Sequence, residues 1–176
     1  GGYASGDFPI TENCYSSNPV IPPAFHFFRK IDPFGSQLIY STFLALSSQG
    51  IAVDDSENVY IGYNSQHFPV TPGAYNTDVS QMYGFCKFAP EGNRLVFSTR
   101  TFGFGYPFPG YDVEMSGIGF DSYGRVYLVG NSRGRVPLPT TPGAYDESFS
   151  GGKYDVFFSI FDPAGSKLLY ATYLGG

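Results

Sequence analysis

The chain has 176 residues, with ten basic and fifteen acidic side chains that give a formal net charge of −5. This length suits a single structural unit, and the acidic balance disfavours binding to nucleic acid or to an anionic membrane surface. Aromatic residues make up 19% of the chain and charged residues only 14%, which excludes a strongly solvated, disordered segment. No apolar run approaches the roughly 18–20 residues of a membrane-spanning helix, so no membrane insertion is expected.

The first unit, residues 1–49, is expected to contain two strands. Its segment 8–11 has the sequence Phe-Pro-Ile-Thr, and an Asp-Pro-Phe-Gly-Ser turn at 32–36 lies between one strand and the apolar strand 38–42. Both landmarks recur later with their turn residues in step, so the chain is a tandem repeat.

Two further units, residues 50–116 and 117–176, each predict four strands. Each has a Pro-Gly-Ala-Tyr segment between its second and third strands. The strands are rich in β-branched and aromatic residues, which favours sheet over helix. The expected strands are 50–54, 58–62, 85–88 and 95–99 in the second unit, and 117–121, 125–130, 156–161 and 168–172 in the third.

The turn residues predict how neighbouring strands pair. An x-Pro-x-Gly turn has proline where its fixed φ is suitable and glycine where φ becomes positive. Residues 85–88 and 95–99 should therefore pair antiparallel across the turn at 90–92. Asp54 and Asp121 are expected to cap the turns that join the first two strands of their units.

The order of these landmarks resembles the bacterial β-propeller repeat family called SBBP. The matching segments are Gly-Ile-Ala-Val-Asp, Asn-Val-Tyr-Ile-Gly, Phe-Pro-x-Thr-Pro-Gly-Ala-Tyr, x-Pro-x-Gly and Leu-x-Tyr-Ser/Ala-Thr. The resemblance implies an all-β fold, a β-propeller segment of four-stranded antiparallel blades with about two and a half blades in this chain. It also implies a secreted or surface-attached bacterial protein, hence an extracellular or cell-surface location.

An incomplete ring of blades would leave its two outer blade faces without cover. Apolar residues such as Val156, Phe158 and Ile160 are expected on such a face. We therefore expect contact with the remaining blades of a longer propeller, with further copies of the chain as the alternative.

Most aromatic residues lie on strands at equivalent positions of the repeat, and we expect them in the core. This core set comprises Phe27, Phe28, Tyr60, Phe97, Tyr127, Phe157 and Tyr170. The Gly/Pro-rich insert at 102–111 lies outside the repeat, and loops on a rigid scaffold commonly carry binding residues. The candidate ligand or partner contacts are Phe104, Tyr106, Phe108, Tyr111 and Asp112.

Several carboxylates could lie near one another at a blade rim. They are Asp112, Glu114, Asp146, Glu147 and Asp155. Their spacing contains neither a catalytic pair nor an Asp-x-Asp-x-Asp-Gly calcium loop, so we interpret them as solvated loop charges. No catalytic residue and no cofactor is predicted, with calcium binding as the alternative.

The histidines and cysteines do not cluster. His26 and His67 have no neighbouring cysteines, which argues against zinc, and His67 is expected at the surface. Cys86 lies in an apolar run and is expected to be a buried thiol, while a bridge to Cys14 stays open.

The sequence therefore predicts a non-enzymatic extracellular or cell-surface module for protein or glycan interaction or for structural assembly. One alternative is a lectin-like carbohydrate-binding domain with aromatic and Asp pockets at equivalent positions on successive blades. Another is a lyase or glycosidase hosted on a propeller, which requires a central cleft with paired carboxylates of perturbed pKa.

Overall fold

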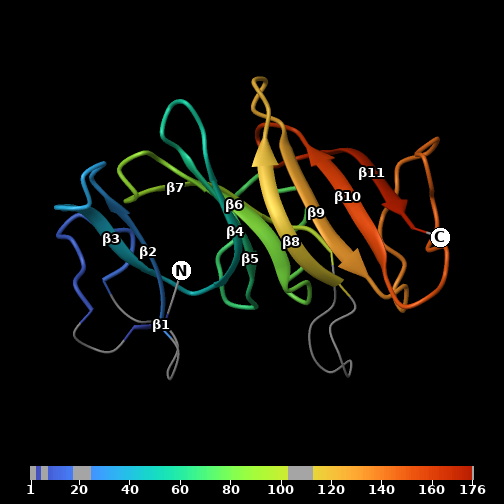
Figure 1. Cartoon of the computed structure of the whole chain (residues 1–176), viewed down its shortest axis with the longest axis horizontal. Coiled ribbons are helices and arrows are strands. Elements are labelled where there is room, and N and C mark those ends of the chain that lie inside the picture. The colour runs from blue at the N-terminus through green and yellow to red at the C-terminus, as the bar shows by residue number, and fades with distance from the viewer. Residues whose placement is uncertain (1–2, 5–7, 18–24, 103–112, 176) are drawn as a thin grey trace.

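The computed structural model describes residues 3–4, 8–17, 25–102 and 113–175. Among these residues, eleven strands and no helix are present, and the strands form three antiparallel sheets that lie side by side in Figure 1. The first sheet contains β1 (Tyr3–Ala4), β2 (Phe25–Ile31) and β3 (Leu38–Leu44). The second contains β4 (Ser47–Val53), β5 (Val59–Asn64), β6 (Tyr83–Phe88) and β7 (Leu95–Arg100). The third contains β8 (Val113–Phe120), β9 (Val126–Ser132), β10 (Asp155–Phe161) and β11 (Leu168–Leu174).

The predicted hairpins are confirmed. The x-Pro-x-Gly turns join β2 to β3, β6 to β7 and β10 to β11, and each pair is antiparallel. The glycines at the ends of these turns, Gly35, Gly92 and Gly165, have φ of 71°, 67° and 64°. This left-handed conformation is one that glycine adopts without the steric cost of a Cβ atom.

The β4–β5 and β8–β9 turns are capped by aspartate side chains, as predicted. In the β4–β5 turn, Asp54 Oδ1 accepts a hydrogen bond from the backbone N–H of Asn58 at 2.8 Å. In the β8–β9 turn, Asp121 Oδ1 accepts one from the backbone N–H of Arg125 at 3.0 Å. Each carboxylate thus satisfies backbone donors of its own turn.

The Phe/Leu-Pro-x-Thr segments run along the last strand of each sheet. The hydroxyl of each threonine pairs with one residue of that strand: it donates to the backbone carbonyl of that residue and accepts from the backbone N–H of that residue. The pairs are Thr11 with Ser41, Thr71 with Ser98 and Thr141 with Ala171. Because an unpaired edge strand favours association with other chains, these segments protect the outer edge of each sheet.

Each sheet has two faces, because side chains alternate along a strand. In the first and second sheets, we call the face directed toward the next sheet the forward face, and it carries Phe28 and Phe85. The forward face of the third sheet is the equivalent one, which carries Phe158. The opposite face is the back face, and it carries Ile31, Phe88 and Phe161. The second sheet is covered on both faces, so two apolar cores form, one on each side of it.

The all-β fold with four-stranded antiparallel sheets agrees with the prediction, although the first sheet has three strands rather than two. The additional strand is β1, in which Tyr3 pairs with His26 and Ala4 with Phe25. Two residues are too few to produce a strand pattern in the sequence.

The predicted aromatic core set is buried only in part. Phe28, Tyr60, Phe97 and Phe157 are buried. Phe27, Tyr127 and Tyr170 are half-buried. Phe27 lies on the back face of the first sheet and the two tyrosines lie on the forward face of the third, and no other described sheet covers either face.

Candidate functional site

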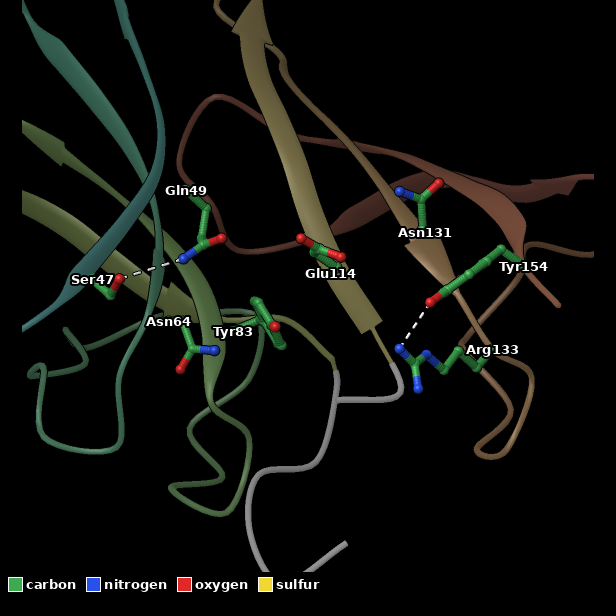
Figure 2. Close-up of a pocket in the computed structure, with 8 residues that line it drawn as sticks. All are labelled: Ser47, Gln49, Asn64, Tyr83, Glu114, Asn131, Arg133 and Tyr154. Atoms are coloured by element: carbon green, nitrogen blue, oxygen red, sulfur yellow. Dashed lines mark hydrogen bonds between the residues drawn. The ribbon is translucent and has the colours of Figure 1, made fainter. Parts of the chain in front are cut away.

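A polar cleft of about 350 Å³ lies between the second and third sheets. Its lining consists of Ser47, Gln49, Asn64, Tyr83, Glu114, Asn131, Arg133 and Tyr154. Figure 2 shows the first four side chains on one side of the cleft, Glu114 on β8 in the middle, and the last three on the other side. The volume is within the range of about 300–1,000 Å³ that small-ligand sites commonly have.

Two pairs of lining residues come from equivalent positions of the repeat. Asn64 ends β5 opposite Ser47, and Asn131 lies near the end of β9 opposite Glu114. Since β4 and β8 are neighbours in space, these strand ends face a common opening. The repeat therefore places an amide from each of two sheets in one cleft.

Hydrogen bonds inside the cleft are few. Gln49 Nε2 donates to Ser47 Oγ at 3.5 Å, which is a long contact, and Arg133 Nη2 donates to the Tyr154 hydroxyl at 2.8 Å (Figure 2). Within the described part of the chain, neither the Asn64 amide nor the Glu114 carboxylate has a side-chain hydrogen bond or ion pair. Polar groups therefore remain available to a ligand.

The cleft combines amides with single charges. Its described lining has one carboxylate, Glu114, which is exposed, and one guanidinium, that of Arg133. Tyr83 is buried and Tyr154 is exposed at the rim, with the Arg133 guanidinium 5.1 Å from the ring centroid of Tyr154. Such a lining can hydrogen-bond a ligand in several directions and has little net charge.

All five residues predicted as contacts lie outside the described residues, in the segment 103–112. They are Phe104, Tyr106, Phe108, Tyr111 and Asp112. The segment is followed directly by Val113 and then Glu114, the residue of β8 that lines the cleft.

The other described carboxylates of the predicted set, Asp146, Glu147 and Asp155, are not among the lining residues of the cleft. Asp146 and Glu147 cap their own loop: Asp146 Oδ1 accepts from the N–H of Ser148, and Glu147 Oε1 accepts from the N–H of Gly143. The hydrogen bond from Ser150 holds the pKa of Asp146 below its usual range.

The interpretation of Asp155 as a solvated loop charge was wrong. Asp155 begins β10 and is buried, and its Oδ2 accepts a hydrogen bond from the backbone N–H of Ser150 at 2.6 Å. The residue was misassigned because the sequence does not show that the preceding loop, residues 146–154, folds over the start of the strand.

Cys86 is fully buried in β6, as predicted, and burial raises the pKa of its thiol. Both Cys14 and Cys86 are free thiols. His67 is exposed, as expected. The residues that the structure describes include no group of three or more metal-ligating side chains, and none of their segments is a helix able to cross a bilayer.

Sequence reasoning missed most of the cleft. Asn64, Asn131, Gln49 and Arg133 were not among the predicted contacts. Asn64 and Asn131 lie at the ends of strands that look like core sequence, Arg133 directly follows β9, and Gln49 lies within β4. One signal was available: an Asn-Ser pair ends the second strand in both four-stranded units, at Asn64 and Asn131. A polar pair at the same place in two repeats indicates that the two strand ends lie at the same end of neighbouring sheets.

The three packed antiparallel sheets, with the first strands of the second and third sheets adjacent, define blades of a β-propeller. Residues 96–135 match the model of the SBBP family, which is described as a beta-propeller repeat. The match extends from β7 to just beyond β9 and so crosses from the second sheet into the third. The chain thus carries an SBBP β-propeller repeat, and no curated protein matches it.

Proposed function

We propose that this chain is a non-enzymatic interaction module on the outside of a bacterial cell, and that its polar cleft binds a glycan. The location rests on the resemblance to secreted and surface-attached proteins with SBBP repeats. The binding role rests on the cleft itself.

One observation carries the glycan assignment: three amide side chains, Gln49, Asn64 and Asn131, line a single cleft. An amide both donates and accepts hydrogen bonds, as does each hydroxyl of a sugar, so the two groups match without any net charge. The exposed ring of Tyr154 adds apolar surface, against which the C–H face of a sugar can pack.

The lining also supports binding rather than catalysis. Hydrolysis of a glycosidic bond commonly uses two carboxyl groups about 5–10 Å apart on either side of the bond. Glu114 is the one carboxylate among the described lining residues. The other described acidic residues considered above contact their own loops instead.

Binding of the labelled chain to a glycan array tests this proposal. We expect a restricted set of glycans to bind, and we expect the double variant Asn64→Ala, Asn131→Ala to lose most of that signal. The matched control is Asn93→Ala, because Asn93 is an exposed asparagine in the β6–β7 turn, away from the cleft.

Absence of binding to every glycan on the array would contradict the glycan assignment. Equal binding by the double variant and the wild type would show that any glycan site lies elsewhere. Turnover of an array glycan that stops in Glu114→Gln would contradict the non-enzymatic role.

A further inference from the structure

The two contacts between neighbouring sheets are built alike. In the first, Phe28 on the forward face of the first sheet packs on Phe88 of the second sheet, with ring centroids 5.4 Å apart. In the second, Phe85 packs on Phe161 of the third sheet at 5.0 Å. The same pair of repeat positions thus meets twice.

A tyrosine from the Pro-Gly-Ala-Tyr loop, or from its counterpart in the first unit, adds a second contact. Tyr15 meets Phe88 edge-on, with a centroid distance of 5.1 Å and an interplanar angle of 84°. Tyr75 meets Phe161 at 5.2 Å and 73°. Each back-face phenylalanine is therefore enclosed by two aromatic rings of the preceding unit, one from a strand and one from a loop, and both phenylalanines have an exposed fraction of 0%.

A third contact places an aromatic ring against a turn glycine of the following sheet. A Cβ atom at Gly92 would lie 2.5 Å from Cε2 of Tyr40, and one at Gly165 would lie 2.7 Å from Cε2 of Phe97. Only glycine leaves room for this approach. Tyr40 and Phe97 occupy the same position in β3 and β7.

The third sheet presents the forward half of this contact, and no sheet in the described part of the chain packs on it. Phe158 and Tyr170 are half-buried, and Tyr145, at the position of Tyr15 and Tyr75, is 81% exposed. The backbone N–H of Tyr145 donates to the Tyr170 hydroxyl at 3.2 Å, so the two tyrosines are neighbours.

The back face of the first sheet presents the residues of the other half of this contact. Ile31, at the position of Phe88 and Phe161, is 44% exposed. Gly35 is at the position of Gly92 and Gly165, and no atom of the described residues lies within 4 Å of the place where its Cβ would be. The back face of the first sheet thus has the open turn glycine and the apolar residue that the forward face of the third sheet would contact.

We propose that the forward face of the third sheet binds the back face of the first sheet in a second copy of this chain. Tyr170 of one copy would lie against Gly35 of the other, and Phe158 and Tyr145 would enclose Ile31. The contact continues the one that the chain already makes twice internally.

A second copy is the occupant that the structure favours, because both halves of the contact are present on the same chain. Such a contact is head-to-tail, and two copies joined in this way supply six sheets, which lies within the roughly four to eight blades of closed propellers. The proposal does not depend on what the polar cleft binds.

Sedimentation velocity of the chain at increasing concentration tests the proposal. We expect a species with twice the mass of one chain, and a loss of at least about tenfold in association constant for Tyr145→Ala, as for a central aromatic contact. The control is Tyr123→Ala, because Tyr123 is 77% exposed and lies in the β8–β9 turn.

The opposite face is tested by Gly35→Ala. This substitution adds a methyl group at a positive φ, so its control is Gly73→Ala, which has a φ of 80° and equally open surroundings. We expect Gly35→Ala, but not Gly73→Ala, to weaken association. Circular dichroism of each variant verifies that it is folded.

A chain that stays monomeric at high micromolar concentration would overturn the proposal. So would association that neither Tyr145→Ala nor Gly35→Ala weakens, since the copies would then meet through other surfaces. Association weakened only by Tyr145→Ala would also overturn it, because the third sheet would then bind a surface other than the back face of the first.

Discussion

The second and third sheets carry the same repeat but bury it to different extents. Phe85 and Phe158 occupy equivalent positions on the forward face, yet Phe85 is fully buried and Phe158 is half-buried. Tyr60 is likewise buried, stacked on Phe120 of the third sheet, whereas its counterpart Tyr127 is half-buried.

This difference in burial comes from the presence or absence of a neighbouring sheet and not from the residue types. The third sheet covers the forward face of the second, and no described sheet covers the forward face of the third. In a repeat protein of this kind, each unit therefore owes much of its stability to the unit beside it. Substitutions at equivalent positions measure how much.

The largest difference is expected between Phe85→Ala and Phe158→Ala. Removing a fully buried phenylalanine ring costs about 3–5 kcal/mol, so Phe85→Ala should lower the free energy of unfolding by this amount. Phe158→Ala should cost about 1 kcal/mol, because the ring is half-exposed in a single copy. Urea unfolding followed by circular dichroism in dilute protein measures both values, and equal losses would contradict the comparison.

A second difference lies at the end of the last strand of each sheet. The buried guanidinium of Arg100 donates hydrogen bonds to carbonyls of the loop 65–68, whereas the Tyr173 hydroxyl accepts one from the N–H of Leu138 at 2.9 Å. Arg100→Leu leaves several buried carbonyls unpaired and should cost about 2–4 kcal/mol, against about 1 kcal/mol for Tyr173→Phe. The same urea titration measures both losses in the free energy of unfolding. A smaller loss for Arg100→Leu than for Tyr173→Phe would contradict this comparison.

The turn glycines provide a third comparison. Gly165→Ala places a methyl group against Phe97 at a positive φ and should cost about 2–3 kcal/mol. Gly35→Ala has the same backbone strain but open space around it, so in dilute protein it should cost only about 1 kcal/mol. Thermal unfolding of the two variants measures the difference, and an equal loss would show that the ring does not press on the turn.

The smallest expected effect is a pH dependence of stability that arises at the β8–β9 turn. Partial desolvation raises the pKa of Asp121, but hydrogen bonds from Arg125 and Tyr127 outweigh it and lower the pKa to about 2. Since an unfolded aspartate has a pKa of about 3.9, this carboxylate stabilises the fold above that pH, and the contribution is lost as the pH falls toward 2. The Asp54 carboxylate of the second sheet behaves in the same direction.

Asp121→Asn removes this contribution. The variant should be less stable than the wild type near neutral pH, and its urea midpoint should fall less steeply between about pH 5 and pH 2. An unchanged slope across this window would show that the carboxylate has the same pKa in the folded and unfolded chains.

The strands and turns could be predicted from the sequence, because local chemistry determines them. An x-Pro-x-Gly segment forms a tight turn wherever it occurs, and Asp121 caps the turn in which it lies. Position in the repeat also identified Phe28, Tyr60 and Tyr127 as candidates for burial, but it could not separate the buried Tyr60 from the half-buried Tyr127. That difference depends on which sheet lies next to each.

The cleft could not be predicted for a related reason. Asn64 and Asn131 are 67 positions apart in the sequence, and only the packing of the second sheet on the third brings their strand ends together. Glu114 was noted as a carboxylate, but nothing in the sequence places it beside these amides. Long-range contacts of this kind follow from the whole fold rather than from any local pattern.

The most direct test of the account compares Tyr75 with Tyr145, which occupy the same position in neighbouring repeats. Tyrosine nitration followed by peptide mass spectrometry measures how accessible each ring is. In dilute protein Tyr145 should react much faster than Tyr75, because Tyr75 packs on Phe161 whereas Tyr145 is exposed. The reaction of Tyr145 should slow as the protein concentration rises and a second copy covers it. Equal reactivity of the two tyrosines in dilute protein, or a Tyr145 rate that does not change with concentration, would contradict the account.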